Sequence, residues 1–419
     1  MDKSNRQIVV IGAGPAGLMA AFAAAKKYKS GVLLLEKNDS PAKKLLISGS
    51  GRCNITHAGP ISGFLPHYGG KDRFVKPALF RFTNTDLTKW MQHRGLPLKE
   101  LHDGKLFPVT ESARDVLQIL LNVLLTECSP LVEVRYRAAV KNVKRSENGF
   151  LIQTANEDFS AQNLVIATGG KSYPSTGSTG DGWNFARNLG HSIAEPAPAL
   201  CPVTIRNYPF AGCAGLSFEK TRVQVQHHGK KTAENREDLL LTHRGFSGPV
   251  ILDLSRYIHT GDTLRIAFTE SEDTAFFERQ FLERVAKTGR KTVKNLLASA
   301  YLPDRMTAVL LKYLNIPDDL AAANLGKAAR KTLLRYLTDA PFIVEELGGY
   351  QEAMVTRGGV VLAEVNRNTM ESRLVPGLFF CGEVLDIDGD TGGYNLQFAF
   401  SSGVLAGENL HLVLYGENS

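Results

Sequence analysis

"QIVVIGAGPAGLMAAFAAAKK", residues Gln7 to Lys27, is the stretch that decides the fold. The β-branched run at its start predicts a strand that is buried on both faces, and the alanine-rich continuation predicts a helix. Between them, Gly12, Gly14 and Gly17 complete a G-x-G-x-x-G pattern. The first glycine allows a tight turn, the second lets the backbone approach a pyrophosphate, and the third lets the helix pack closely on the strand.

A second buried strand, "GVLLLEKN", follows this helix and ends at Glu36, 19 residues after Gly17. A carboxylate at that place can accept hydrogen bonds from both ribose hydroxyls of an adenosine. The β-α-β unit therefore predicts a dinucleotide at the helix N-terminus, and a glycine turn without a ligand is the alternative. This pattern alone does not separate NAD from FAD.

Two later glycine turns favour FAD. "NLVIATGG" (Asn163–Gly170) predicts a buried strand and a turn, where the chain can approach the dinucleotide again. The stretch "GLFFCGEVLDIDGDTGGYNLQFAFSSG" (Gly377–Gly403) places Glu383 after a strand, where it can bind ribityl hydroxyls. The helix that starts near Tyr394 can then stabilise the reduced, anionic flavin ring with its N-terminus. A capped helix and loop that bind no ligand are the alternative.

The pattern of elements predicts four segments. Strands and helices in the first and last thirds indicate two halves of one α/β domain, and prolines from Pro196 to Pro202 mark a boundary between the first half and an insertion. We expect an FAD-binding domain in two parts, an inserted β-rich substrate domain and an inserted basic helical domain. Their residues are 1–196 and 346–419, 197–271, and 272–345, respectively.

The formal net charge of +7 is concentrated in two regions. Residues 1–110 hold 17 Lys and Arg against 7 Asp and Glu, and residues 278–335 hold 12 against 5. In the first region cations alternate with Phe and Trp side chains, which suits contacts to RNA phosphates and bases. Amphipathic helices with their rings in the core are the alternative. The candidate nucleic-acid-binding residues are Lys71, Arg73, Lys76, Arg81, Arg290 and Lys291.

The composition excludes several other classes of protein. Five scattered cysteines include no C-x-x-C pair, which argues for a reducing compartment and against a zinc ribbon or a dithiol site. The longest apolar runs are too short to span a membrane, and the first residues do not resemble a secretion signal. We expect a cytoplasmic protein with no membrane partner, no disulfide partner and no metal site. The sequence leaves the oligomeric state open.

The loop "SGSGRCNITH" (Ser48–His57) follows the predicted ribose-binding carboxylate. Its small residues suit a path along the FAD diphosphate and ribityl chain. Arg52 would offset phosphate charge, and Asn54 offers amide hydrogen bonds. Cys53 has no partner cysteine, so we interpret it as a small residue in a cofactor loop. A catalytic thiol, activated by Arg52, is the alternative.

Several stretches together resemble one family. They are "IGAGPAGLMAA", "KKLLISGSGRCNIT", "LLLTHRGFSGP", "GEVLDIDGDTGGYNLQFAFSSG" and "EAMVTRGGV" (Glu352–Val360). They resemble the BaiN/RdsA family of FAD-dependent oxidoreductases, also called YhiN-like flavoproteins, over nearly the whole chain. The resemblance implies an α/β fold. Its Rossmann-like FAD-binding domain, of the glutathione-reductase/fumarate-reductase type, would be in two parts, with an inserted β-barrel-like part and a helical part.

The resemblance also implies the residues that hold FAD, with the backbone of one of them, Val134, at the adenine. They are Gly12, Ala13, Gly14, Gly17, Glu36, Lys37, Arg52, Asn54, Val134, Thr168, Gly169, Gly382, Glu383, Asn395 and Leu396.

Two activity classes are implied by the resemblance. One is dihydrouridine formation in large-subunit ribosomal RNA, and the other is turnover of small molecules by aminoacetone oxidases or steroid ene reductases. The two basic regions favour RNA. Because the chain has one complete G-x-G-x-x-G, NAD(P)H would dock transiently as the electron donor. His243, Cys53 and Tyr394 are the candidate proton donors. A flavin-binding scaffold without turnover is the non-enzymatic alternative.

Overall fold

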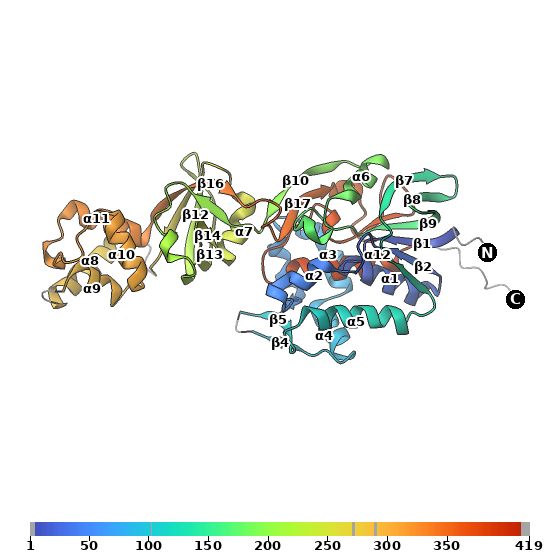
Figure 1. Ribbon diagram of the computed structural model, residues 1–419, viewed down its shortest axis with the longest axis horizontal. Coiled ribbons are helices and arrows are strands. Elements are labelled where there is room, and N and C mark those ends of the chain that lie inside the picture. The colour runs from blue at the N-terminus through green and yellow to red at the C-terminus, as the bar shows by residue number, and fades with distance from the viewer. Residues whose placement is uncertain (1–4, 102, 270–272, 289–290, 412–419) are drawn as a thin grey trace. The chain divides into compact units, whose positions relative to one another are not determined.

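The structure is a computed structural model that describes residues 5–101, 103–269, 273–288 and 291–411. The chain forms two compact units (Figure 1). The α/β unit takes the described residues up to Pro198 and those from Met354 onward, and the barrel unit takes Ala199–Ala353. Each unit has its own hydrophobic core.

A seven-stranded sheet is the centre of the α/β unit. Five neighbouring strands are parallel: β6 (Val132–Arg135), β2 (Val32–Leu35), β1 (Asn5–Ile11), β9 (Asp158–Ile166) and β18 (Leu378–Phe380). The hairpin of β7 (Val140–Ser146) and β8 (Gly149–Thr154) extends the sheet through an antiparallel pairing with β9. Residues Ile8–Ile11 and Val32–Leu35 are all buried, as their continuous apolar runs predict for strands covered on both faces.

Helices α1 (Pro15–Tyr28) and α12 (Tyr394–Glu408) come from opposite ends of the chain and pack tightly together. A Cβ atom on Gly403 would lie 2.3 Å from the Ala16 carbonyl oxygen, and one on Gly407 would lie 2.3 Å from that of Ala20. This close approach joins the first and last thirds of the sequence in one α/β unit, which the pattern of elements predicts.

The other elements of the α/β unit complete its two small sheets and its helical cover. They are α2 (Lys43–Ile47), η1 (Ser48–Gly51), β3 (Thr56–His57), η2 (Ile61–Tyr68), α3 (Asp72–Arg81), α4 (Asn84–Gln92), β4 (Leu98–Glu100), β5 (Lys105–Pro108), α5 (Ala113–Thr126), η3 (Pro174–Thr176), α6 (Asp181–Asn188), β10 (Ile193–Ala199), β17 (Val355–Val360), η7 (Leu362–Glu364) and η8 (Gly382–Val384).

A closed barrel of six strands is the centre of the barrel unit. In barrel order these are β11 (Val203–Ile205), β14 (Gly245–Ser247), β13 (Lys230–Leu241), β12 (Ser217–His227), β15 (Thr263–Ala267) and β16 (Ala340–Leu347). Alternate residues of β12, such as Val223 and Val225, face the buried core, which also holds Phe246 and Phe342. Helix α7 (Pro249–Leu254) follows β14, and η4 (Ala211–Cys213) and η5 (Ser255–Tyr257) are short turns of 3-10 helix.

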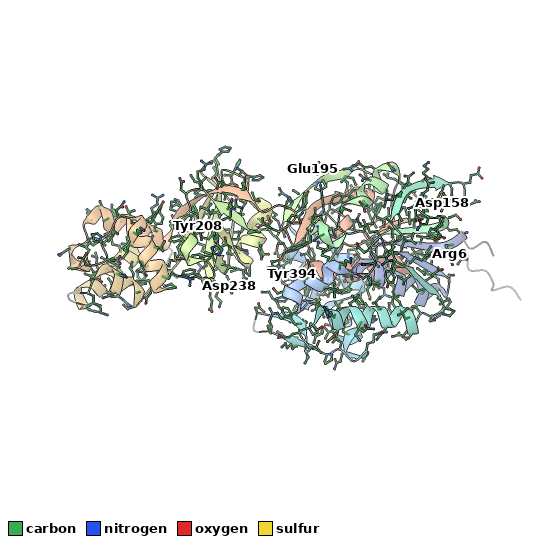
Figure 2. All side chains as sticks on the ribbon, in the orientation of Figure 1. Arg6, Asp158, Glu195, Tyr208, Asp238 and Tyr394 are labelled. Carbon is green, nitrogen blue, oxygen red and sulfur yellow. The ribbon has the colours of Figure 1, made fainter. Side chains whose placement is uncertain are left out.

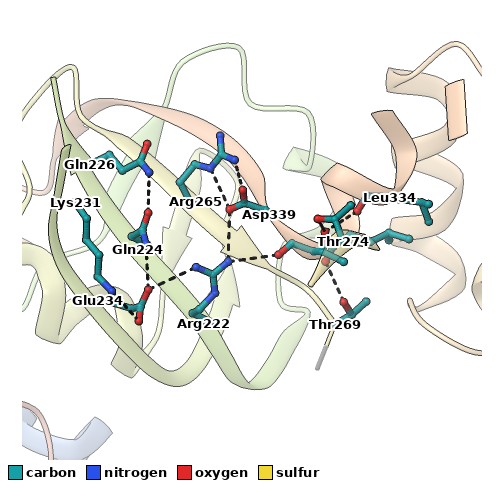
Figure 3. A network of polar contacts seen from close by, with 12 residues as sticks. Arg222, Gln224, Gln226, Lys231, Glu234, Arg265, Thr269, Thr274, Leu334 and Asp339 are labelled. Carbon is teal, nitrogen blue, oxygen red and sulfur yellow. Dashed lines mark hydrogen bonds and ion pairs between the residues drawn. The ribbon is translucent and has the colours of Figure 1, made fainter. Parts of the chain in front are cut away.

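Four helices share the hydrophobic core of the barrel. They are α8 (Thr274–Thr288), α9 (Val293–Ala298), α10 (Asp304–Tyr313) and α11 (Lys327–Thr338), with η6 (Ala322–Asn324) before the last. A polar network joins them to the strands: Arg265 makes a bidentate ion pair with Asp339, and Arg222 lies 3.5 Å from the same carboxylate (Figure 3). Across the described residues, no helix combines the length and apolarity that a membrane span requires.

Candidate FAD site

The loops that follow the parallel strands of the α/β unit carry most of the predicted FAD residues. Gly12 to Gly14 follow β1, Glu36 follows β2, Thr168 and Gly169 follow β9, and Gly382 and Glu383 follow β18. Because these strands are parallel neighbours, their carboxyl ends meet at one edge of the sheet. Ligands of open α/β sheets bind outside that edge.

The three glycines of the first turn differ in the space around them. A Cβ on Gly12 would lie 2.5 Å from the Ala167 carbonyl oxygen, and one on Gly17 would lie 1.9 Å from that of Gly12. These two glycines are therefore required by packing between β1, α1 and the turn after β9. A Cβ on Gly14 would meet no protein atom within 4 Å. Packing does not require a glycine at position 14, whereas close approach of a ligand would.

The N-terminus of α1 lacks a side-chain cap among the described residues. Its N-cap is Gly14, which makes no side-chain capping bond, and no acidic residue lies in its first turn. The first N–H groups of a helix have no partner within the helix, and the aligned peptide dipoles give this end a partial positive charge. The end is therefore suited to bind the negative charge of a diphosphate.

The Glu36 carboxylate is held beside this turn. Its Oε2 accepts a hydrogen bond from the Ala13 backbone N–H at 2.9 Å, and its Oε1 accepts one from Asn38 N–H at 2.9 Å. An ionised carboxylate can accept about four hydrogen bonds, so two sites remain for ribose hydroxyls. Ala13 thus acts through its backbone by fixing the carboxylate.

Thr168 contributes a hydroxyl without a partner at the same edge. Its Oγ1 is buried and makes no hydrogen bond among the described residues. A Cβ on Gly182 would lie 2.1 Å from this oxygen, so the start of α6 comes very close to it. Leaving a buried hydroxyl unsatisfied costs about 1–3 kcal/mol, and a polar ligand group at this edge would offset that cost. Gly169, the next residue, has the left-handed conformation with φ +72°.

The N-terminus of α12 is built by two glycines and two asparagines. Gly392 and Gly393 have φ values of +115° and +96°, and a Cβ on Gly393 would lie 2.6 Å from the Thr56 backbone. With its amide oriented to satisfy its neighbours, Asn54 accepts a hydrogen bond from Gly393 N–H at 3.1 Å. The Asn395 side chain accepts from Gly389 N–H at 2.8 Å and donates to the Gly389 carbonyl at 2.9 Å. Both asparagines shape the loop around the helix start.

An ion pair that the sequence analysis missed lies after β18. Lys44 of α2 donates to both oxygens of Glu383, at 2.8 and 3.1 Å, and also to the Ser172 hydroxyl. The Thr356 backbone N–H donates to Glu383 Oε1 at 2.8 Å. Glu383, which its place after a strand predicts to bind the ribityl chain, is thus fixed by a lysine. Lys44 and Thr356 lie in two of the stretches that carry the resemblance, which is the signal that marks them.

A second missed cluster surrounds Tyr394, which Figure 2 labels. The rings of His57 and His67 are nearly parallel to the Tyr394 ring, with centroids 5.4 and 4.0 Å from it. His67 Nδ1 lies 2.9 Å from Asp390 Oδ2. Because a carboxylate only accepts hydrogen bonds, Nδ1 of His67 carries the proton and Nε2 is available to another partner. The cluster places a half-exposed imidazole next to the start of α12.

Cys53 is buried in the loop before β3. Its side chain is 0% exposed, and burial raises the pKa of the thiol to about 12, against a smaller lowering by a hydrogen bond with Ser48. A thiol with that pKa is protonated at neutral pH and does not face solvent. Complete burial favours its interpretation as a small loop residue, and its role as a proton donor stays a prediction. Tyr394 is also buried, 6% exposed, and His243 is exposed on the turn between β13 and β14 of the barrel unit.

Five other predicted FAD residues have simple placements. Lys37 forms an ion pair with Asp181 at 2.7 Å, and the exposed Arg52 stacks over the Phe107 ring at 5.0 Å. Gly382 has φ +73° and donates through its backbone to the Ser402 hydroxyl at 3.0 Å. Val134 lies in the edge strand β6, and Leu396 lies in the first turn of α12.

Two of the predicted nucleic-acid-binding residues in the α/β unit form ion pairs with carboxylates. Lys71 pairs with Asp386 at 2.7 Å and with Asp388 at 3.4 Å, and Arg81 makes a bidentate pair with Glu408. These carboxylates compete with phosphate for Lys71 and Arg81, and their role in binding RNA stays a prediction. Phe74 is buried on the apolar face of α3, as the amphipathic alternative predicts.

Two cations of α3 stay in the candidate set. Arg73 and Lys76 are exposed. In the barrel unit Lys291 is exposed as well, and Arg290 lies outside the described residues.

The site as a whole fits an FAD. Within the described part of the chain, it offers an uncapped helix N-terminus for phosphates, a fixed carboxylate for the ribose, an unpartnered buried hydroxyl and open space over Gly14. These are the features by which a dinucleotide is recognised in a Rossmann-like domain.

Comparison with known proteins shows relatives along nearly the whole chain. A ribosomal RNA dihydrouridine synthase of Escherichia coli is 34% identical over 407 residues, which cover 96% of this chain and 97% of the relative. A 3-dehydro-bile acid delta(4,6)-reductase of Clostridium scindens is 30% identical over 408 residues, covering 96% and 98%. A ribosomal RNA dihydrouridine synthase of Haemophilus influenzae is 32% identical over 402 residues, covering 94% and 96%.

Two solved structures of other enzymes show a weaker similarity. A flavocytochrome c3 fumarate reductase has a TM-score of 0.46 at 17% identity and covers 97% of this chain and 78% of its own. A 3-ketosteroid delta1-dehydrogenase of Sterolibacterium denitrificans has a TM-score of 0.48 at 12% identity, covering 97% and 99%. Residues 6–409 match the family described as the HI0933-like protein Rossmann domain. The chain therefore belongs to the HI0933-like family and is an FAD-dependent oxidoreductase.

Proposed function

We propose that this enzyme reduces uridine to dihydrouridine in large-subunit ribosomal RNA, with NAD(P)H as the electron donor. One observation carries the proposal, a stripe of exposed cations on α11. Lys327, Lys331 and Arg335 are spaced by four residues and therefore lie on one face of the helix. Leu333, Leu334 and Leu337 form its buried face.

The three cations of this stripe make no ion pair or side-chain hydrogen bond with any described residue. Like charges four residues apart destabilise a helix by about 0.2–0.5 kcal/mol per pair. A bound polyanion would offset the repulsion between these like charges. Each cation that contacts a phosphate also releases a counterion, which favours binding. Arg279, Arg284 and Lys287 of α8, and Lys291 before α9, are further exposed cations of the barrel unit, and RNA is a partner that such cations fit.

The relatives support the same substrate class. Two of them, at 34% and 32% identity over nearly full length, are named ribosomal RNA dihydrouridine synthases. Dihydrouridine differs from uridine by one hydride and one proton across the C5=C6 bond. A ribosomal substrate places the proposed reaction in the cytoplasm.

Bound FAD would supply the hydride. The residues proposed to hold it are those gathered at the carboxyl edge of the sheet, with Gly14 and the α1 N-terminus at the diphosphate and Glu36 at the ribose. Lys44 holds Glu383 in place. Asn54 and Asn395 hold the loop at the N-terminus of α12. NAD(P)H docks transiently, since the sequence has one complete G-x-G-x-x-G.

The proton for the second carbon needs its own donor. His67 suits this role better than Cys53 or Tyr394, because its side chain is 38% exposed and its Nδ1 is oriented by Asp390. A carboxylate that accepts from one ring nitrogen fixes the tautomer and the direction of the other nitrogen. His243 stays a second candidate, supplied by the barrel unit.

The test is reduction of purified large-subunit ribosomal RNA from a strain that lacks the gene. The FAD-loaded enzyme with NAD(P)H is expected to generate dihydrouridine, measured by mass spectrometry of the nucleosides. Replacing Lys327, Lys331 and Arg335 by Ala should weaken RNA binding at least tenfold and reduce the slope of log K against log salt by about 2. Lys294→Ala is the control, because Lys294 is a half-exposed cation of the same unit that already pairs with Asp318 at 2.6 Å.

Three results would contradict the proposal. NAD(P)H that bleaches the flavin without dihydrouridine forming in RNA would favour the second candidate, a small-molecule ene reductase. The 30% identical bile acid reductase is the observation that supports this candidate. Rapid O₂ consumption with small amines would instead indicate an oxidase. A flavin that no donor bleaches would indicate a scaffold.

A further inference from the structure

Two histidines and an aspartate meet at one end of the barrel strands β12 and β15. His227 is the last residue of β12, and Asp262 directly precedes β15. The pairing of Gln226 with Thr263 makes His227 and Asp262 the next residues across the two antiparallel strands. His259 joins them through a turn in which its backbone N–H donates to Asp262 Oδ2 at 2.8 Å.

The three side chains converge on a single carboxylate. Nδ1 of His227 lies 2.6 Å from Asp262 Oδ1, and Nδ1 of His259 lies 3.6 Å from Asp262 Oδ2. One ligand atom from each residue can be chosen so that all three lie within 4.8 Å of one another. Among the described residues, this is the one group of His, Cys, Asp and Glu side chains that meets that condition.

We propose that His227, His259 and Asp262 bind a divalent transition-metal ion of the zinc class. Zinc binds imidazole nitrogen at about 2.0–2.1 Å and carboxylate oxygen at about 2.0–2.2 Å, so neighbouring ligand atoms in a tetrahedral site lie about 3.4 Å apart. The separation of His259 from Asp262 already matches this spacing. The His227 ring has to move by about 1 Å, with the metal replacing the proton that it shares with Asp262.

Burial and backbone contacts prepare the carboxylate for this role. Asp262 is 2% exposed, and its backbone oxygen accepts a hydrogen bond from Val344 N–H at 2.8 Å, which ties it to β16. The two imidazoles are exposed, with side-chain exposures of 46% and 60%, so an ion can enter from solvent. Three protein ligands leave at least one coordination position for water, which is typical of an exchangeable site.

The ion would cross-link two turns of the barrel. His227 begins the turn between β12 and β13, and His259 and Asp262 form the turn before β15. Metal binding at the folded site alone stabilises the folded state by mass action. The sequence predicts no metal site here, because the three ligands follow no known ligand spacing and come together only in the folded barrel.

The experiment is titration of the FAD-loaded, untagged full chain with Zn²⁺ alone, followed by calorimetry. The wild type is expected to bind one more ion per chain than His227→Gln or His259→Gln, or to bind the ion at least tenfold more tightly. Zn²⁺ should raise the melting temperature of the wild type and not that of either variant. Both histidines are exposed, so both variants are expected to fold.

His228→Gln is the matched control, because His228 is an exposed neighbour in the same turn and is not part of the cluster. Its zinc binding should equal that of the wild type. Co²⁺ provides a second measurement, since its visible absorption reports nitrogen and oxygen ligation and should be lost in His259→Gln. Equal zinc binding by the wild type and both cluster variants, or no binding by the wild type, would overturn the proposal.

Discussion

Three lysines near the candidate FAD site and the three cations of the α11 stripe differ in what they contact. In the α/β unit Lys37, Lys44 and Lys71 each lie within 2.8 Å of a carboxylate oxygen. In the barrel unit the stripe on α11 has no such partner among the described residues. Both regions are equally conspicuous as basic segments of the sequence. The comparison teaches that a count of charges locates candidates, whereas ion pairing decides which of them are available to an anion.

The glycines of the first turn give a similar contrast within the α/β unit. Gly17 is required by packing, and Gly14 lies in open space. Gly17→Ala would force a Cβ to within 1.9 Å of the Gly12 carbonyl oxygen. We expect a loss of about 3 kcal/mol in the free energy of unfolding and loss of bound FAD, measured by denaturant titration and by flavin absorbance.

Gly14→Ala should have the opposite pattern. The apoprotein should be as stable as the wild type, while FAD affinity falls about tenfold, a cost of about 1.4 kcal/mol. Gly31→Ala is the control, because a Cβ there also meets no atom within 4 Å and lies outside the turn. Full FAD affinity in Gly14→Ala would contradict the placement of the diphosphate over this residue.

The charge comparison is tested by a pair of single substitutions. Lys71→Ala removes one cation from Asp386 and the buried Asp388, and we expect a loss of about 1–2 kcal/mol in stability with RNA binding unchanged. Lys331→Ala removes an unpaired charge, so stability should stay within about 0.5 kcal/mol while RNA binding weakens severalfold. Thermal unfolding and filter binding measure the two effects. If Lys71→Ala weakens RNA binding as much as Lys331→Ala, pairing does not decide availability.

Local patterns were sufficient for the framework of the fold and for part of the site. The strand-turn-helix of residues 7–27 and the glycine turns after β9 and β18 are encoded by neighbouring residues. The pairs that complete the site are not: Lys44 and Glu383 are 339 residues apart, and His67 and Asp390 are 323 apart. No periodicity brings such residues together, because the parallel strands and the packing of α1 on α12 do so only in the folded chain.

Segment α3 shows the other limit of sequence reasoning. Its alternation of rings and cations suits an RNA contact, but Phe74 and Leu79 belong to the core and Arg81 to an ion pair. An α-helix has 3.6 residues per turn, so the same alternation also gives a helix with one buried and one exposed face. The prediction for the stripe on α11 uses the same periodicity, with the difference that its cations lack partners.

His191 adds a pH dependence to the α/β unit. Its side chain is 0% exposed, and burial lowers the pKa of the ring, partly opposed by Glu364. The unfolded chain then binds a proton more readily than the folded one, so the stability from neutral His191 is lost as pH falls below about 6.5. Each pKa unit by which folding lowers the value corresponds to about 1.4 kcal/mol in the free energy of unfolding. Unfolding between pH 5 and 8 should be less pH-dependent in His191→Gln, and an unchanged profile would contradict this assignment.

Cys53 separates packing from chemistry in the cofactor loop, with a small expected effect on turnover. Cys53→Ser keeps a small side chain that can hydrogen-bond to Ser48, so we expect a loss of about 1 kcal/mol in stability and turnover within about twofold of the wild type. Stopped-flow reduction of the flavin by NAD(P)H and calorimetry measure the two quantities. A variant that binds FAD but no longer reduces substrate would restore the thiol as a proton donor. It would also mean that the loop opens during turnover, because the thiol is fully buried in this structure.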